Sequence, residues 1–384
     1  MIKAVKIRLY PTKKQEVLMF KSIGCSRFAY NWALNRCNEL YESGEKHSMA
    51  NIRKEFTQLK KQEEFKWLNE VSNTAMTESM RNLDKAFKSF FNKKSKYPKF
   101  KSKRKSRQSF YVRYDSLYFK NNICNIEKVG KVRFKTNYSI PDCNYTNPYC
   151  SYDGKYWYLS FGFEHDENQV VLNKDLSVGI DLGVKDLAIV NCLDEPVKNI
   201  NKTKRVRKLK KKLKRLQRQV SRKYEKLKID KTFKKGERPI KTQNIIKLEQ
   251  EIKLIHRKLK NIRNNHIHQA TNKIVKLYPY RVVMEDLNIS GMMKNKHLSK
   301  VIQEQCLYEF IRQMEYKCEF NGIDFIQVDR LYPSSKTCSN CGCIKSDLKL
   351  SDRIYKCNDC DFKIDRDKNA SINLGNYNLK SKLV

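Results

Sequence analysis

The chain has 384 residues, enough for two or three packed units, and 40% of them are hydrophobic. Its 81 Lys and Arg against 41 Asp and Glu give a formal net charge of +40, which favours a polyanionic partner, nucleic acid above all. No apolar run approaches the roughly 20 residues of a membrane-spanning helix, and the N-terminus lacks a signal-peptide core. Thirteen cysteines, odd in number and mostly scattered, argue against a disulfide framework. We therefore expect a cytosolic protein that binds nucleic acid and no membrane.

The N-terminal segments change from a strand pattern to a helical pattern and back. Residues 1–10 place Val5, Ile7 and Leu9 on one face, which predicts a half-buried strand ending before Pro11. From about 13 to 91 the period is helical, most clearly in the run Met76, Met80, Leu83, Phe87 and Phe90. Short strand-like runs follow at 110–114, 123–129 and 156–163, and Asp153-Gly154 predicts a two-residue hairpin turn. If the first strand joins these, the helices are an insertion between strands of one small barrel.

Two basic segments of this half are candidate nucleic-acid contacts. The outer face of the helix at 76–90 carries Glu78, Arg81, Lys85 and Lys88, which is either a solvated surface or a contact. Residues 93–107 hold nine Lys or Arg, no acid and interleaved aromatic residues. Such a run suits phosphate contacts and base stacking, and a disordered basic linker is the alternative. The side chains predicted to contact nucleic acid are Arg81, Lys85, Lys99, Lys101, Arg330 and Lys336.

Two later segments read as buried strands that each carry an acid. Residues 178–183 contain Asp181 among apolar and small residues, and a Gly183 turn leads into a second strand at 187–190. Residues 281–287 repeat the pattern and contain Glu285. A charge on such a strand is costly to bury unless it is paired or binds a metal, although Asp181 could also simply cap the turn. A helical segment at about 300–320 and a strand at 323–328 complete the order expected for a mixed sheet covered by helices.

Residues 201–235 hold 18 Lys or Arg and two acids. Their apolar residues step by three and four from Val206 to Leu227, and a second run does so from Ile245 to Ile262. Two such seams, joined by a polar loop with Gly236 and Pro239, predict an antiparallel helical hairpin. We expect the seams to be structural and the basic outer faces to contact a nucleic-acid backbone.

The most specific motif is a pair of C-x2-C turns, Cys338 with Cys341 and, fifteen residues later, Cys357 with Cys360. Four thiolates at this spacing predict a structural zinc ribbon, because each turn supplies two sulfurs of one tetrahedron. Cys343 is close enough to replace Cys341, and four free thiols are the other alternative. A closed four-cysteine site stabilises the fold and offers no open position for catalysis.

The last motif, residues 364–374, predicts a helix with Asp367 in its first turn, where the helix dipole favours an anion. Capping alone would also explain this acid. Asp181, Glu285 and Asp367 are thus three candidate carboxylates, the ligands that hard divalent ions prefer. Two ions about 4 Å apart can support in-line cleavage of a phosphodiester. Because the acids repel one another, we expect the site to gather fully only when metal is bound.

Four stretches resemble TnpB (OrfB), the insertion-sequence family related to type V CRISPR effector nucleases. They are residues 179–183, residues 283–288, the cysteine ribbon with residues 334–338 before it, and residues 365–370. The resemblance is strong over about 178–374 and weaker but colinear in the N-terminal half. It implies an RNase H-like RuvC nuclease domain in which Asp181, Glu285 and Asp367 bind Mg²⁺ and catalyse. Asp367 is chosen over Asp365 because the acid of the family pattern lies two residues before an Asn.

The resemblance also implies a partner set and an α+β domain plan. A guide RNA would select double-stranded target DNA beside a short flanking motif, in the prokaryotic cytosol and associated with the nucleoid. The expected parts are a wedge β-barrel at 1–10 and 108–170, a helical recognition domain at 11–107, a RuvC-like domain at 175–335 with its hairpin at 201–272, a zinc ribbon at 336–362, and a RuvC-like motif and tail at 363–384. The alternatives are a non-catalytic, nucleic-acid-binding transposon regulator and a compact type V CRISPR effector.

Overall fold

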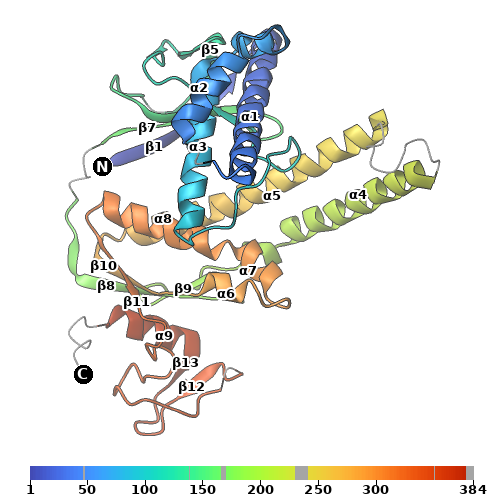
Figure 1. The fold of residues 1–384 in the computed structure, drawn as a ribbon. Coiled ribbons are helices and arrows are strands. Elements are labelled where there is room, and N and C mark those ends of the chain that lie inside the picture. Colours follow the sequence, from blue (N-terminus) through green and yellow to red (C-terminus); the bar gives the residue numbers. More distant parts are fainter. Residues whose placement is uncertain (46–47, 138, 166–169, 230–240, 350, 378–384) are drawn as a thin grey trace. The chain divides into compact units, whose positions relative to one another are not determined.

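The computed structural model describes residues 1–45, 48–137, 139–165, 170–229, 241–349 and 351–377. The chain divides into two compact units, Met1–His165 and Asp166–Val384, and each is described by itself (Figure 1). Both units combine helices with a sheet, so the α+β class predicted from the sequence is confirmed. None of the helices in the described ranges is long and apolar enough to cross a membrane.

The first unit is built on a curled, half-barrel sheet with the strand order β2-β6-β7-β1-β5-β4-β3. Its first strand lies inside the sheet, because β1 pairs antiparallel with both β7 and β5. Ile7 and Leu9 of β1 are each 2% exposed, as the alternation predicts. The strands are β1 (Ile2–Tyr10), β2 (Ser109–Tyr111), β3 (Phe119–Lys120), β4 (Ile123–Ile126), β5 (Gly130–Lys135), β6 (Thr146–Tyr152) and β7 (Trp157–Glu164).

The helices between β1 and β2 are an insertion between strands of one sheet, as expected. They are α1 (Lys13–Glu42), α2 (Met49–Leu59), the 3-10 helix η1 (Glu63–Glu70) and α3 (Asn73–Phe91). Both alternatives for α3, a solvated surface or a nucleic-acid contact, placed Glu78 on an outer face, whereas Glu78 is only 7% exposed. The Glu78 carboxylate lies 3.3 Å from Arg81 Nη1 and 3.8 Å from Lys85 Nζ. The reason is that α3 contacts β2 as well as α1, so its second face is also covered.

Two predicted β features differ from the observed ones. The turn between β6 and β7 contains four residues, Asp153 to Tyr156, because Tyr152 pairs with Trp157. Asp153 Oδ1 accepts the backbone N–H groups of the last two turn residues at 3.1 and 2.9 Å, which stabilises the longer turn. The single strand expected at 123–129 ends at Ile126, and the chain turns there into β5 through Gly130, whose φ is +86°.

The second unit has a mixed four-stranded sheet in the order β11-β10-β8-β9. β10 is parallel to both β8 and β11, and β9 returns antiparallel beside β8. The mixed sheet and the turn after Gly183 are therefore as predicted. The strands are β8 (Asn173–Leu182), β9 (Ala188–Val190), β10 (Pro279–Glu285) and β11 (Asp324–Val328).

Helices cover both faces of this sheet (Figure 1). On one face, α7 (Ser299–Gln305), α8 (Leu307–Phe320) and part of α5 (Gln243–Val275) pack with alternate residues of β8 and β10. On the other, Leu374 of α9 (Arg366–Gly375) packs with Val283. The helix expected at 300–320 is interrupted at Cys306, whose φ of +57° ends α7 and starts α8. Short elements, α6 (Ile289–Met292) and η2 (Ile200–Lys202), complete the unit.

The predicted helical hairpin is present as α4 (Lys204–Ile229) and α5, which lie antiparallel in Figure 1. Its seam buries Val206, Leu216, Ile255 and Leu259, all from the two apolar runs. The connecting loop with Gly236 and Pro239 lies outside the described residues.

Candidate functional site

Asp181 and Glu285 lie at the carboxyl ends of neighbouring parallel strands. Gly179 of β8 pairs with Val283 of β10, so two positions further along Asp181 lies beside Glu285. Strands lie about 4.8 Å apart and their side chains alternate between faces, so both acids are on the face that α9 covers. Asp367 is in the first turn of α9. All three acids line one cavity of about 640 Å³.

The wall of this cavity is rich in cations. Basic side chains come from the β8–β9 loop, from the cysteine segment and from the start of α9. The same lining contains a fourth acid, Asp186, beside the three candidate carboxylates. Cations this close to carboxylates can attract a phosphate group that the acids alone would repel. The basic residues are Lys185, Lys336, Lys349, Arg353 and Arg366.

Each of two acids has a neighbouring partner that orients it. Ser334 Oγ donates a hydrogen bond to Glu285 Oε1. The Asp367 carboxylate accepts from Arg366, with Nη2 at 3.1 Å from Oδ1, and its other oxygen lies 3.8 Å from Arg353 Nη1. Because Arg366 is largely buried and Asp367 partly so, this pair fixes the carboxylate at the cavity.

Asp181 is in an unfavourable position for a carboxylate. Burial raises its pKa well above the usual range, and the negative charges of Glu285 and Asp367 raise it further, against a smaller opposing effect of Arg366. A divalent cation bound among the acids would favour the ionised form again. The charges of Glu285 and Asp367 thus act on Asp181 in the folded chain, although successive members of this group are 104 and 82 positions apart in the sequence.

Asp365 and Asp367 have different surroundings. Asp365 is the N-cap of α9, and its Oδ1 accepts the backbone N–H groups of Asp367 and Lys368 at 3.0 and 3.1 Å. Asp367, two residues further and in the first turn of α9, is the one of the two that lines the cavity. This favours the sequence-based choice of Asp367 as the third ligand, and that role stays a prediction.

The acids fit a divalent ion in chemistry, and they are spread over the cavity. Carboxylate oxygens are the donors that Mg²⁺ prefers. Among the described residues, however, the four cysteines form the one group of three or more possible ligands within 4.8 Å of one another. The expectation that the acids gather fully only with metal bound therefore stays a prediction.

The four predicted cysteines do come together. Cys338 Sγ lies 3.7 Å from Cys360 Sγ, and Cys341 Sγ lies 3.6 Å from Cys357 Sγ. A zinc tetrahedron with bonds of about 2.3 Å has sulfur–sulfur edges of roughly 3.8 Å, so the cluster has the size of a zinc site. Cys343 is outside this group, which favours Cys341 over Cys343, and the zinc ligand set stays a prediction.

The cysteine segment also contains a small hairpin, β12 (Ile354–Lys356) with β13 (Lys363–Asp365). Asn340 Nδ2 donates to Cys360 Sγ, and this hydrogen bond is the main cause that lowers the pKa of Cys360 to about 6. A low thiol pKa favours the thiolate that binds a metal.

Two asparagines of α9 anchor the first cysteine turn, and sequence reasoning missed them. Asn369 is fully buried; its Nδ2 donates to the Thr337 carbonyl at 2.7 Å and its Oδ1 accepts from Ser339 N at 3.0 Å. Asn373 Nδ2 donates to the carbonyls of Ser334 and Thr337 at 2.7 and 2.6 Å. The helix that carries Asp367 thus also holds the metal-binding turn. Buried amides among small helical residues are the signal that could have revealed this.

Lys368 is a further missed residue. Its Nζ donates to three backbone carbonyls at the end of β9, at distances of 3.1, 2.9 and 2.9 Å. This fixes the start of α9 to the strand that follows the Asp181 turn. The three acceptors are Val190, Asn191 and Leu193.

The predicted nucleic-acid contacts fall into different settings. Lys336 lines the cavity of the acids. Arg330 is engaged by Asp286, whose Oδ2 lies 2.7 Å from its Nη2. Arg81 and Lys85 are exposed and share the buried carboxylate of α3. Contact with nucleic acid stays a prediction for all of them.

The two lysines predicted from the basic run also differ. Lys99 is exposed. Lys101 Nζ lies 3.6 Å from the centre of the Tyr30 ring. The backbone N–H of Lys101 donates a hydrogen bond to Asn31 Oδ1, and its carbonyl accepts one from Asn31 Nδ2. Burial lowers the pKa of Lys101 to about 8. This part of the run is therefore fixed on α1, which argues against a disordered linker there.

Models of three protein families match successive parts of the chain. The helix-turn-helix model of IS605 OrfB matches residues 1–46, the OrfB probable-transposase model matches 160–296, and the Cas12f1-like TNB model matches 308–374. A putative RNA-guided DNA endonuclease of Streptomyces pristinaespiralis is 30% identical over 377 residues, which cover 97% of this chain and 88% of that protein. The chain belongs to the TnpB (OrfB) family.

Other relatives agree with this family. The putative RNA-guided DNA endonuclease InsQ of Escherichia coli K12 is 28% identical, with 97% of this chain and 91% of that protein covered. The CRISPR-associated endodeoxyribonuclease Cas12f1 of Sulfoacidibacillus thermotolerans is 30% identical over 133 residues, 33% of this chain and 30% of that protein. The family predicted from the motifs is therefore confirmed.

The fold has a solved counterpart. The structure of a Cas12f1–sgRNA–target DNA complex contains a chain of similar fold, with a TM-score of 0.56, 15% identity and 99% of both chains covered. The helix-turn-helix description differs from the local structure, because residues 1–45 of this TnpB-family chain contain one strand, Ile2–Tyr10, and one 30-residue helix, Lys13–Glu42.

Proposed function

We propose that the chain is an RNA-guided DNA endonuclease of a bacterial or archaeal insertion sequence. A guide RNA would supply sequence specificity by pairing with target DNA, beside a short flanking motif that the protein reads. Membership of the TnpB family supports this, as do the names of its relatives. The structural observation that carries the proposal is the convergence of acids from β8, β10 and α9 on one cation-walled cavity.

The second unit would be an RNase H-like, RuvC-like nuclease domain, with Asp181, Glu285 and Asp367 holding two Mg²⁺ ions. Divalent ions bound there would supply the water activation and the charge stabilisation that in-line phosphodiester hydrolysis needs. Ser334 orients the Glu285 carboxylate, and Arg366 orients that of Asp367. Cations on the wall would hold the scissile phosphate in place.

The four cysteines would hold one structural Zn²⁺. Their spacing, their sulfur–sulfur distances and the match of residues 308–374 to the TNB model support zinc. The curled sheet of the first unit would be the wedge barrel, and its inserted helices the recognition domain. The parts expected at 1–10 with 108–170, 11–107, 175–335, 336–362 and 363–384 include some residues outside the described ranges, among them 378–384.

The test is cleavage of matched plasmid DNA by protein purified with its copurifying RNA, which is sequenced to define the guide. We expect Mg²⁺-dependent cutting that Asp181→Asn abolishes. Asp175→Asn, an exposed acid on the same strand, is the matched control and should cut normally. Target binding without Mg²⁺-dependent cleavage by the unchanged protein would instead indicate a non-catalytic transposon regulator.

A second candidate is a compact type V CRISPR effector. The TNB match and the 30% identity to Cas12f1 over 133 residues favour it for the C-terminal region. Genomic position decides between the two, because a CRISPR effector requires a neighbouring repeat array, whereas an insertion-sequence enzyme lies beside a transposon end whose transcript is the guide.

A further inference from the structure

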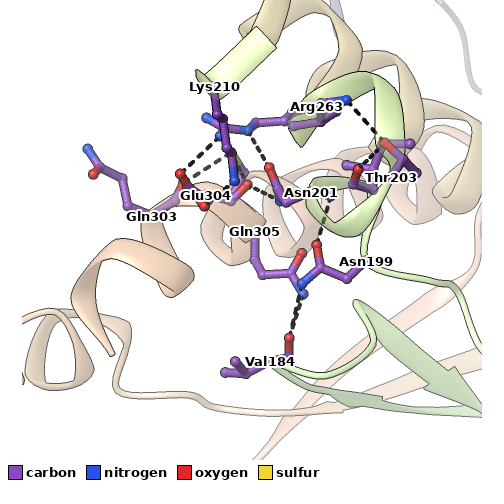
Figure 2. A network of polar contacts seen from close by, with 12 residues as sticks. Val184, Asn199, Asn201, Thr203, Lys210, Arg263, Gln303, Glu304 and Gln305 are labelled. Carbon is purple, nitrogen blue, oxygen red and sulfur yellow. Dashed lines mark hydrogen bonds and ion pairs between the residues drawn. The ribbon is translucent and has the colours of Figure 1, made fainter. Parts of the chain in front are cut away.

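Three consecutive backbone carbonyls of the β8–β9 loop, residues 183–185, accept hydrogen bonds from side chains of other elements. Gln305 Nε2 donates to the first two at 3.3 Å each. Asn199 Nδ2 donates to the second at 3.1 Å, and Lys202 Nζ donates to the third at 2.7 Å. Figure 2 shows the amides of Gln305 and Asn199 pointing at Val184. The donors that hold the loop thus belong to segments other than β8 and β9.

This loop forms part of the cavity of the three acids. It begins directly after Asp181 and Leu182, and residues 182–186 line the cavity. Within the loop, a backbone bond from Gly183 N to Leu187 O at 3.3 Å closes the turn. The orientation of the remaining peptide units therefore depends on the side chains that bind their carbonyls.

Gln305 is well placed to fix the loop. It is 3% exposed and is the last residue of α7, directly before the left-handed Cys306. Its amide nitrogen binds two carbonyls at once, so both of its N–H donors are used on the loop. Replacing this amide by an apolar group would leave two carbonyls without this donor.

The residue before Gln305 ties α7 to the helical hairpin. Glu304 accepts from Lys210 of α4, with Nζ at 2.5 Å, and lies 3.6 Å from Arg263 Nη2 of α5. Asn201 Nδ2 donates to the Glu304 carbonyl at 2.8 Å, and Asn201 Oδ1 accepts from Arg263 Nε at 2.9 Å. Figure 2 shows this network running from the hairpin to Val184.

We propose that Gln305 and Asn199 are positioning residues for the cavity that contains Asp181. They hold the β8–β9 loop. Gln305 follows Glu304 directly, and Asn199 Oδ1 accepts from Asn201 N at 2.9 Å, so the Glu304 network joins both residues to the α4–α5 hairpin. The loop-holding role stands on the geometry alone. Its consequence for DNA cleavage rests on the proposed function.

The first test is hydrogen exchange of the loop in the protein without metal or nucleic acid. Gln305→Met keeps the side-chain volume and removes the amide. Gln303→Met is the matched control, because Gln303 is exposed and points away from the loop in Figure 2. We expect amides of residues 183–187 to exchange about tenfold faster in Gln305→Met, the effect of losing one or two hydrogen bonds. Exchange in the control should match the unchanged protein.

The second test separates binding from chemistry. In RNA-loaded protein, Gln305→Met should lower the single-turnover cleavage rate by about 10- to 100-fold, as loss of an outer partner does. Target affinity should stay within about twofold, and Mn²⁺ binding, followed by electron paramagnetic resonance, should weaken. Equal loop exchange and equal rates in both variants would overturn the proposal.

Two further arms keep the tests decisive. If Gln305→Met does not fold, Asn199→Asp keeps the side-chain shape, removes the donor to the Val184 carbonyl and should speed exchange of the same loop. If the unchanged protein cuts no DNA, the proposed function fails, while loop exchange still decides whether Gln305 positions the loop.

Discussion

A Cβ atom built on Gly179 of β8 would lie 2.0 Å from the carbonyl oxygen of Ser371 in α9. Helix and strand backbones therefore touch at this point, and Ser177 Oγ adds a 2.6 Å hydrogen bond to the Gly375 carbonyl. The contact sets the height of α9 over the sheet. Since Asp367 is one turn before Ser371 and Asp181 is two residues after Gly179, this approach decides the spacing of two candidate ligands.

Gly179→Ala tests this close approach. The methyl group has no room against backbone atoms, so α9 must move, and we expect a loss of about 1–3 kcal/mol in the free energy of unfolding. Gly24→Ala in α1 is the control, because nothing lies within 4 Å of its Cβ position. It should gain up to about 1 kcal/mol. Urea unfolding measures both, and equal stability of Gly179→Ala and the unchanged protein would refute the packing argument.

Asp181→Asn tests the electrostatic cost of the acid cluster. The folded pKa of Asp181 is raised above its unfolded value, so the folded state binds the proton more tightly. The unfavourable contribution is fully present above the folded pKa and is relieved as pH falls towards about 4. Without metal, the variant should melt higher than the unchanged protein at neutral pH, and the difference should shrink in acid.

The same variant should lose function. Cleavage should fall by more than the roughly 10- to 100-fold typical of outer-sphere partners. Added Mg²⁺ should raise the melting temperature of the unchanged protein more than that of Asp181→Asn, because a ligand that binds the folded state stabilises it. Equal Mg²⁺ stabilisation of the two proteins would contradict the assignment of Asp181 as a ligand.

The cysteine cluster predicts one bound zinc per chain. Cys338→Ser should lower the zinc content and expose the segment around 336–362 to proteolysis, because the apolar cluster around the cysteines is small. Cys343→Ser is the matched control, since this thiol lies outside the cluster. Elemental analysis of the three proteins decides the matter, and a zinc content near zero in the unchanged protein would overturn the zinc assignment.

Lys317 of α8 predicts a pH-dependent stability. It is 9% exposed, and its Nζ donates to Thr271 Oγ1 at 2.6 Å and to the His268 carbonyl at 3.2 Å. Burial lowers the pKa of Lys317 from 10.5 to about 8. The folded state thus holds the proton less tightly, so the unfavourable contribution is fully present below pH 8 and disappears as pH rises to about 10.5.

Lys317→Met should therefore stabilise the protein near pH 7, by at most about 3 kcal/mol, and the gain should vanish towards pH 10. Lys300→Met, at an exposed position on α7, should change stability little at any pH. Unfolding curves measured from pH 7 to 10 test this. A gain that is constant with pH would show that the lysine is not desolvated.

The basic face of α4 predicts a salt-dependent contact. Lys211, Lys214, Arg218 and Arg222 are exposed along one side of the helix, over about 17 Å at 1.5 Å per residue. The double variant Lys214→Ala, Arg218→Ala should reduce the salt slope of guide-RNA affinity by about two, one for each lost phosphate contact. Lys212→Ala is the control, because Lys212 is paired with Glu251. An unchanged salt slope in the double variant would show that this face of α4 does not contact the guide RNA.

Local patterns carried most of the predictions that the structure confirms. The alternation in β1, the stepping of the hairpin seams and the cysteine spacing each reflect geometry within a few residues, which periodicity and spacing report directly. The acids on apolar strands were recognisable for a similar reason. Burying a lone charge costs free energy unless the charge is paired or binds a metal, so such a residue indicates a site.

The predictions that failed depended on helix packing and strand pairing, which lie outside the short motif from which each was made. Glu78 looked solvated on its helix, and the contact of α3 with β2 buries it. The two-residue turn at Asp153-Gly154 became four residues, because register follows the pairing of Tyr152 with Trp157. Neither contact leaves a trace in the periodicity of its own segment.

By itself, the sequence determined which residues could bind metal, because ligand chemistry and spacing belong to the side chains. Only the tertiary structure decided which of them meet: that Asp367 rather than Asp365 lines the cavity, that Cys343 lies outside the group of four cysteines, and that Gln305 reaches the loop beside Asp181. The physical reason is that strand register and the packing of α9 on Gly179 bring together groups more than 100 residues apart, and these contacts are made only when the sheet and its helices assemble.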